Sequence, residues 1–171
     1  MPPTPLPGMF GLTRIGGPLG VAISLGQWAV GDGSRYTHAY VVLNDGKVME
    51  AMPSGARVRS LAHAKTHHPT AYSWPIHLTD EQRQLIVAQA CVLEGTKYGF
   101  AAYLHLVLSR VGIRWPWLVR YMRRNGRMIC SQLVDEVYRR AGIKLFDDDR
   151  APHDVTPGDL ANLLIEKDWR S

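Results

Sequence analysis

Two β-rich segments flank a turn signal near the middle of the N-terminal half. Residues 36–43 and 47–52 are separated by Asn44-Asp45-Gly46, which is a strong hairpin signal. Both faces of this hairpin are largely apolar, so we expect other elements to cover each face. Further strands are predicted at three shorter runs, residues 9–15, 57–61 and 71–77.

Apolar residues at helical spacing predict several helices. Thr79 and Gln82 form a capping box at the start of one helix, which Gly95 ends. Its inner face should carry three apolar residues, Leu85, Ala88 and Val92. Other helices are predicted over residues 20–30, 98–111 and 128–141, and after a start signal at residues 156–159.

The length of the hairpin loop decides which side chains share a face. A three-residue loop at residues 44–46 places Glu50 opposite Tyr40. His38 and Glu50 are then diagonal neighbours on one face, with backbones about 7–8 Å apart. A two-residue loop would turn Glu50 to the opposite face.

Cys130 opens the predicted helix over residues 128–141, whose apolar stripe is formed by Leu133, Val134, Val137 and Ala141. A thiol at a helix N-terminus meets unpaired N–H groups and the positive end of the helix dipole, and both favour the thiolate. A histidine that takes the thiol proton, oriented by a carboxylate, completes a nucleophilic triad. We therefore predict that Cys130, His38 and Glu50 are catalytic; the alternative is that Cys130 is a small core residue.

Composition predicts one globular domain. Of the 171 residues 46% are hydrophobic and 20% charged, and we expect a single domain over residues 9–171 after a flexible, proline-rich lead-in over residues 1–8. Two cysteines do not make a disulfide framework, and Cys91 is expected in the core. Because no signal peptide and no run of about 18 apolar residues is found, a cytoplasmic location is the default expectation.

A basic and aromatic segment over residues 110–127 holds six arginines. It is a candidate for binding an anionic membrane surface through Arg114, Trp115, Trp117, Arg120, Arg123 and Arg124. The alternative is a solvated basic face with the tryptophans packed inward. A net charge of +5 with one local patch gives no reason to expect specific binding of nucleic acid.

Three histidines close together in the sequence are candidate metal ligands: His63, His67 and His68. No HExxH pattern accompanies them, and Pro69 follows at once. We expect a solvated loop here, with no metal and no cofactor.

Three motifs together carry a resemblance to a known family. The hairpin YTHAYVVLNDGKVMEA, the later MICSQLV and the closing TPGDL resemble the circularly permuted NlpC-like (papain-like) cysteine hydrolases, in the YiiX/YebB-like branch. The resemblance runs from Phe10 to Leu164. It implies an α+β fold, a circularly permuted papain-like (NlpC-like) fold in which a small antiparallel sheet packs against the nucleophile helix. It also implies that Cys130 is the nucleophile, His38 the general base and Glu50 the third polar residue.

The resemblance implies thiol chemistry on an amide, ester or thioester carbonyl, with a peptide or an acyl lipid as substrate. Backbone N–H groups at the start of the Cys130 helix would hold the oxyanion, and Gln27 is a further candidate donor. Many relatives carry an acidic residue two positions after the cysteine, where this chain has Gln132. The alternative function is a catalytically silent module that binds peptide, glycan or lipid in the same groove.

Overall fold

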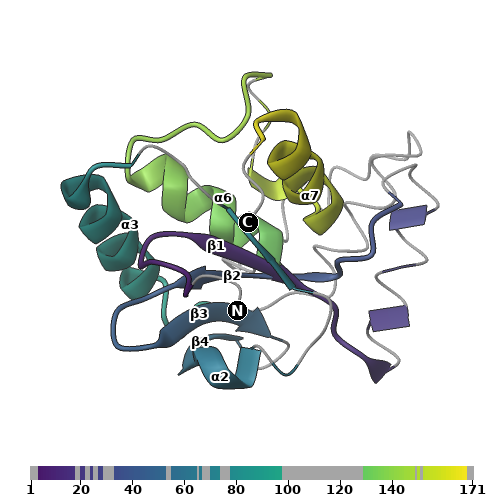
Figure 1. Cartoon of the computed structure of the whole chain (residues 1–171), viewed down its shortest axis with the longest axis horizontal. Helices are drawn as coiled ribbons and strands as arrows, with labels where there is room; N and C mark the ends of the chain where they lie inside the picture. The colour runs from purple at the N-terminus through teal and green to yellow at the C-terminus, as the bar shows by residue number, and fades with distance from the viewer. Residues whose placement is uncertain are drawn as a thin grey trace.

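The fold is a five-stranded antiparallel sheet packed against helices (Figure 1). The computed structural model describes residues 4–17, 20–21, 24, 27–28, 33–52, 55–64, 66, 70–73, 78–97, 129–148, 150 and 152–168. The strand order is β4-β3-β2-β1-β5, and every neighbouring pair is antiparallel. The architecture is therefore of the mixed α and β type that the sequence predicts.

The strands follow the predicted β-rich runs closely. They are β1 (Phe10–Thr13), β2 (His38–Val42), β3 (Lys47–Met52), β4 (Gly55–Ser60) and β5 (Thr70–Tyr72). The helices are α2 (Leu61–Ala64), α3 (Asp80–Val92), α6 (Cys130–Arg140) and α7 (Pro157–Glu166), with a short 3-10 turn, η1, at Pro152–Asp154. The predicted helix over residues 98–111 and the basic segment over residues 110–127 lie outside the described residues.

The β2–β3 hairpin has the register that a three-residue loop requires. Tyr40 pairs with Glu50, and the Leu43 N–H donates to the Lys47 carbonyl at 2.8 Å. Asp45 and Gly46 both have a positive φ, 56° and 64°, so the chain turns in a left-handed conformation at two residues in succession. Glu50 consequently faces the same side of the sheet as Tyr40.

Apolar residues pack on both faces of the sheet, as expected for this hairpin. Figure 1 shows α3, α6 and α7 on one side, where they cover the larger core, and α2 beside β4. The core on this side contains inward residues of the central strands, Leu12, Ala39, Val41 and Met49. A smaller cluster on the other face contains Tyr40, Val42, Val48 and Leu61. The central strand β2 is thus buried along its whole length.

Helix α3 begins as predicted but buries a different face. Thr79 and Gln82 form both hydrogen bonds of the capping box, at 3.0 and 3.2 Å. Its buried residues are Ile86, Val87 and Ala90, whereas all three residues predicted for the inner face, Leu85, Ala88 and Val92, are exposed. The prediction of the inner face was wrong because apolar residues surround this helix on most sides, so spacing alone does not choose the face. For the same reason Cys91, expected in the core, is exposed.

Helix α6 buries the apolar stripe that the sequence predicts, and helix α7 begins at the predicted start signal. All four residues of the α6 stripe are buried, and α7 begins with a capping box between Thr156 and Asp159. The described residues between 20 and 28 are helical, as expected for that stretch. Among the described residues, no helix has the length and apolar character needed to cross a membrane.

The lead-in is held at its last two residues, where we expected flexibility over residues 1–8. The Gly8 N–H donates to the Val42 carbonyl at 2.9 Å, and the Tyr138 hydroxyl donates to the Gly8 carbonyl at 2.5 Å. Arg83 also donates to the Pro7 carbonyl at 3.3 Å. Proline composition did not reveal these contacts because they are made by backbone carbonyls and N–H groups of the lead-in.

Candidate active site

The hairpin brings His38 and Glu50 into direct contact. His38 Nε2 lies 3.1 Å from Glu50 Oε2, and both side chains are buried. The contact follows from the register, because pairing of Tyr40 with Glu50 puts His38 and Glu50 on one face as diagonal neighbours. A local feature of the sequence, the loop length, therefore creates this pair.

Two arginines of β4 lie on the other oxygen of Glu50. The Nε atoms of Arg57 and Arg59 are 3.7 and 3.5 Å from Glu50 Oε1. Burial alone would raise the pKa of Glu50, but the hydrogen bond with His38 and the charges of His38, Arg57 and Arg59 lower it below its usual value. Glu50 is therefore ionised at neutral pH and held at both oxygens.

Sequence reasoning did not single out these arginines. Residues two apart on a strand point to the same face, which is a signal that Arg57 and Arg59 act together. Their partner depends on the β3–β4 register, in which Arg57 pairs with Glu50.

Cys130 is the first residue of α6, and α6 packs against β2 beside His38. Burial alone would raise the pKa of the Cys130 thiol, but a hydrogen bond with His38, its charge and hydrogen bonds from the backbone of Ala39 and Ser131 lower it. For His38 burial alone would lower the pKa, but Cys130 and Glu50 raise it to about 9. The contact between the two groups thus lowers the pKa of the thiol and raises that of the imidazole.

The imidazole of His38 has a different partner on each side. Its Nε2 atom contacts Glu50, so Nδ1 is the ring nitrogen left for the thiol of Cys130. The structure thus brings together all three residues that the sequence predicts for the site. In this arrangement a base can move a proton to and from the cysteine while the carboxylate holds the ring.

Neighbours of Cys130 on α6 support the start of the helix. The Ser131 hydroxyl donates to the Val155 carbonyl at 2.7 Å and ties α6 to the segment before α7. The side chain of Gln132 caps the N-terminus of α6, because its Oε1 accepts a hydrogen bond from the Ile129 N–H at 3.2 Å. The Gln132 amide thus serves a structural purpose two positions after Cys130.

Gln27, the further candidate oxyanion donor, is buried. Neither atom of its amide has a hydrogen-bond partner among the described residues. A buried polar group without a partner is costly, so Gln27 remains a candidate for contact with a bound group.

The histidines considered for a metal site are only partly described. His63 belongs to the short helix α2, and His67 and His68 lie outside the described residues. Within the described part of the chain, no group of three or more His, Cys, Asp and Glu side chains is placed to hold a metal ion.

Comparison with known proteins finds a similar fold. No family model and no curated protein matches the chain. The crystal structure of a protein described as metalloprotein YiiX, from Escherichia coli O157:H7, superposes with a TM-score of 0.59. The match covers 94% of this chain and 81% of that chain, at 21% sequence identity. At this level of identity the comparison shows a shared fold.

Proposed function

We propose that this protein is a cysteine hydrolase of the circularly permuted, papain-like type. The proposal rests on one observation, the contact of Cys130 with His38 at the start of α6 while Glu50 holds the far side of the same imidazole. The order of the residues along the chain, His38, then Glu50, then Cys130, is the order of the permuted family. The YiiX-like fold is compatible with this assignment.

The reaction follows from the protonation states of the pair. The Cys130 thiolate attacks the carbonyl carbon of an amide, ester or thioester, and the carbonyl electrons move to oxygen. When the tetrahedral intermediate collapses, His38 gives its proton to the leaving amine, alcohol or thiol, and a thioester with Cys130 remains. Water then loses a proton to His38 and attacks this thioester, which releases the acid and restores the thiolate and imidazolium.

The remaining groups support these steps without reacting. Backbone N–H groups at the start of α6 would stabilise the negative oxygen, because the first turn of a helix has no preceding turn whose carbonyls could accept from them. Glu50 keeps the imidazole oriented and favours its protonated form. The Gln27 amide is a second candidate donor to the oxyanion. Peptides and acyl lipids are the two substrate classes that we propose.

Hydrolysis of small activated esters, cell-wall peptides and acyl lipids by the purified chain tests the proposal. Turnover should be abolished in Cys130→Ser and His38→Ala and retained in Cys91→Ser, which replaces the exposed cysteine as a matched control. Iodoacetamide at pH 6 should label Cys130 faster than Cys91, because only the thiolate reacts. Binding of a peptide, glycan or lipid without turnover, together with slow labelling of Cys130, would instead indicate a silent binding module.

A further inference from the structure

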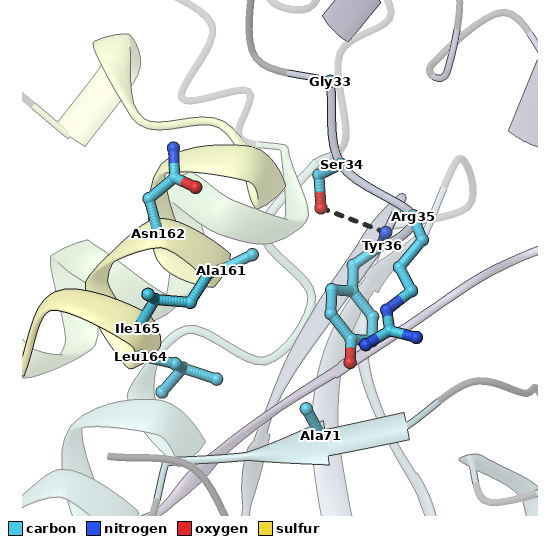
Figure 2. Close-up of a pocket in the computed structure, with 9 residues that line it drawn as sticks. All are labelled: Gly33, Ser34, Arg35, Tyr36, Ala71, Ala161, Asn162, Leu164 and Ile165. Atoms are coloured by element: carbon cyan, nitrogen blue, oxygen red, sulfur yellow. Dashed lines mark hydrogen bonds between the residues drawn. The ribbon is translucent and has the colours of Figure 1, made fainter. Parts of the chain in front are cut away.

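A cavity of about 350 Å³ opens between α7 and the segment that leads into β2 (Figure 2). Residues 34–36 form one wall, α7 forms the opposite wall, and Ala71 of β5 lies at the floor. The residues contributed by α7 are Ala161, Asn162, Leu164 and Ile165. Ligand sites in proteins have volumes of about 300–1,000 Å³, so this cavity is large enough for a small organic group.

The sheet register places this cavity close to Cys130. Ala71 on β5 pairs with Leu12 on β1, and Leu12 pairs in turn with Ala39 on β2. The backbone of Ala39 hydrogen-bonds Cys130. Since adjacent strands are about 4.8 Å apart, the floor of the cavity is about 10 Å from that backbone group.

The wall formed by residues 34–36 continues along the chain to His38, the proposed general base. Tyr36 precedes His38 by two residues, which is about 7 Å of extended chain. A substrate whose carbonyl lies at Cys130 therefore reaches the cavity with a chain of a few residues, or an aliphatic chain of similar length.

The lining of the cavity combines apolar surface with one cation. Leu164, Ile165 and Ala71 present aliphatic side chains, and the Tyr36 ring adds an aromatic face (Figure 2). The Arg35 guanidinium carbon lies 5.5 Å from the centroid of that ring. No carboxylate among the described residues pairs with Arg35, so its donors are available for an anion.

We propose that this cavity is a specificity subsite for an aliphatic substrate group that ends in a carboxylate. The aliphatic part packs on Leu164 and Ile165, and the carboxylate pairs with Arg35. The inference rests on the proposed function in one respect, because it takes the reacting carbonyl to lie at Cys130. It narrows the substrate to a carboxylate-bearing peptide or acyl group and disfavours a neutral fatty acyl chain.

Two ester series test the subsite through turnover. The p-nitrophenyl half-esters of dicarboxylic acids with six to nine carbons should have a KM lower than that of the matching neutral esters. Arg35→Gln should raise the KM of the half-esters several-fold relative to the neutral esters, because the carboxylate then loses its cationic partner. Ala71→Leu, which fills the floor, should weaken the same substrates. Lys47→Gln, an equal change of charge at the exposed hairpin turn, is the matched control.

A binding experiment separates the subsite from catalysis. Suberate should shift NMR resonances of residues 34–36 and of α7 in Cys130→Ser, and the added change Arg35→Gln should abolish these shifts. Equal turnover of both ester series, or no binding of suberate, would overturn the subsite while leaving the proposed hydrolase intact. Binding of suberate through Arg35 without hydrolysis of any ester would overturn the hydrolase and leave the subsite.

Discussion

Replacing Glu50 with glutamine removes the negative charge beside His38 and preserves the size of the side chain. In the native protein the carboxylate lies 3.1 Å from His38 Nε2. Burial alone would lower the pKa of His38, while Cys130 and Glu50 together raise it to about 9. We therefore expect the imidazolium of His38 and the thiolate of Cys130 to coexist up to about pH 9.

The size of the effect follows from the contact that is lost. A hydrogen bond to a charged partner contributes about 1.5–3 kcal/mol, and about 1.4 kcal/mol changes a pKa by one. Glu50→Gln should therefore lower the His38 pKa by about 1–2. The substitution also leaves Arg57 and Arg59 beside the imidazolium without their carboxylate, and their positive charges act in the same direction.

The pH dependence of two rates measures this change. In a Cys91→Ser background, the iodoacetamide reaction of Cys130 reports the thiolate, and its midpoint should move to higher pH in Glu50→Gln. The alkaline limb of kcat/KM for ester hydrolysis reports loss of the imidazolium, and it should move to lower pH. The pH range in which the protein is active should therefore become narrower at both its acidic and its alkaline end.

Glu136→Gln provides the matched control for this substitution. Glu136 is also a buried carboxylate held by two arginines, with Arg139 at 2.8 Å and Arg140 at 2.7 Å, but it lies six residues beyond Cys130 on α6. Its replacement should change neither the midpoint of the iodoacetamide reaction nor the alkaline limb of kcat/KM. Identical profiles for the native protein and Glu50→Gln would refute the assignment of Glu50, and so would an equal shift in Glu136→Gln.

Two further predictions concern the core and the basic segment. Leu133→Ala should lower the free energy of unfolding by about 2–5 kcal/mol, because Leu133 is fully buried on α6. Leu85→Ala, on the exposed side of α3, should lower it by less than about 1 kcal/mol. Equal losses for the two variants in chemical denaturation would contradict the burial described. If residues 110–127 bind an anionic surface, sedimentation with anionic vesicles should fall steeply as salt rises and should weaken in Trp117→Ala and Arg123→Glu. Absence of binding at low salt would remove the membrane proposal.

The parts of the fold that local chemistry determines were predictable from the sequence. The capping boxes at Thr79 and Thr156 involve residues three positions apart, and the hairpin register follows from a single turn. The face of α3 was not predictable, since its apolar residues extend around most of the helix. Burial of Ile86 and exposure of Cys91 are decided by where α6 and the sheet lie.

The candidate site divides in the same way. His38, Glu50 and Arg57 meet through pairing of neighbouring strands, whereas contact with Cys130 depends on packing between elements. Cys130 is 80 residues beyond Glu50, and no spacing rule brings α6 onto β2. The hydroxyl of Ser131 likewise bonds to Val155, a partner that only the packed structure identifies.

This division has a consequence for the stage of folding at which the proposed nucleophile would become reactive. A hairpin forms from contacts close in sequence, so a chain still being synthesised can assemble His38 and Glu50 long before Cys130 exists. Until α6 docks, the cysteine has the ordinary thiol pKa of about 8.5 and is almost entirely protonated at pH 6. Misfolded or unfinished molecules would then carry no activated nucleophile that could attack other cellular components. Rapid alkylation at pH 6 should, for the same reason, count only correctly folded copies in a preparation.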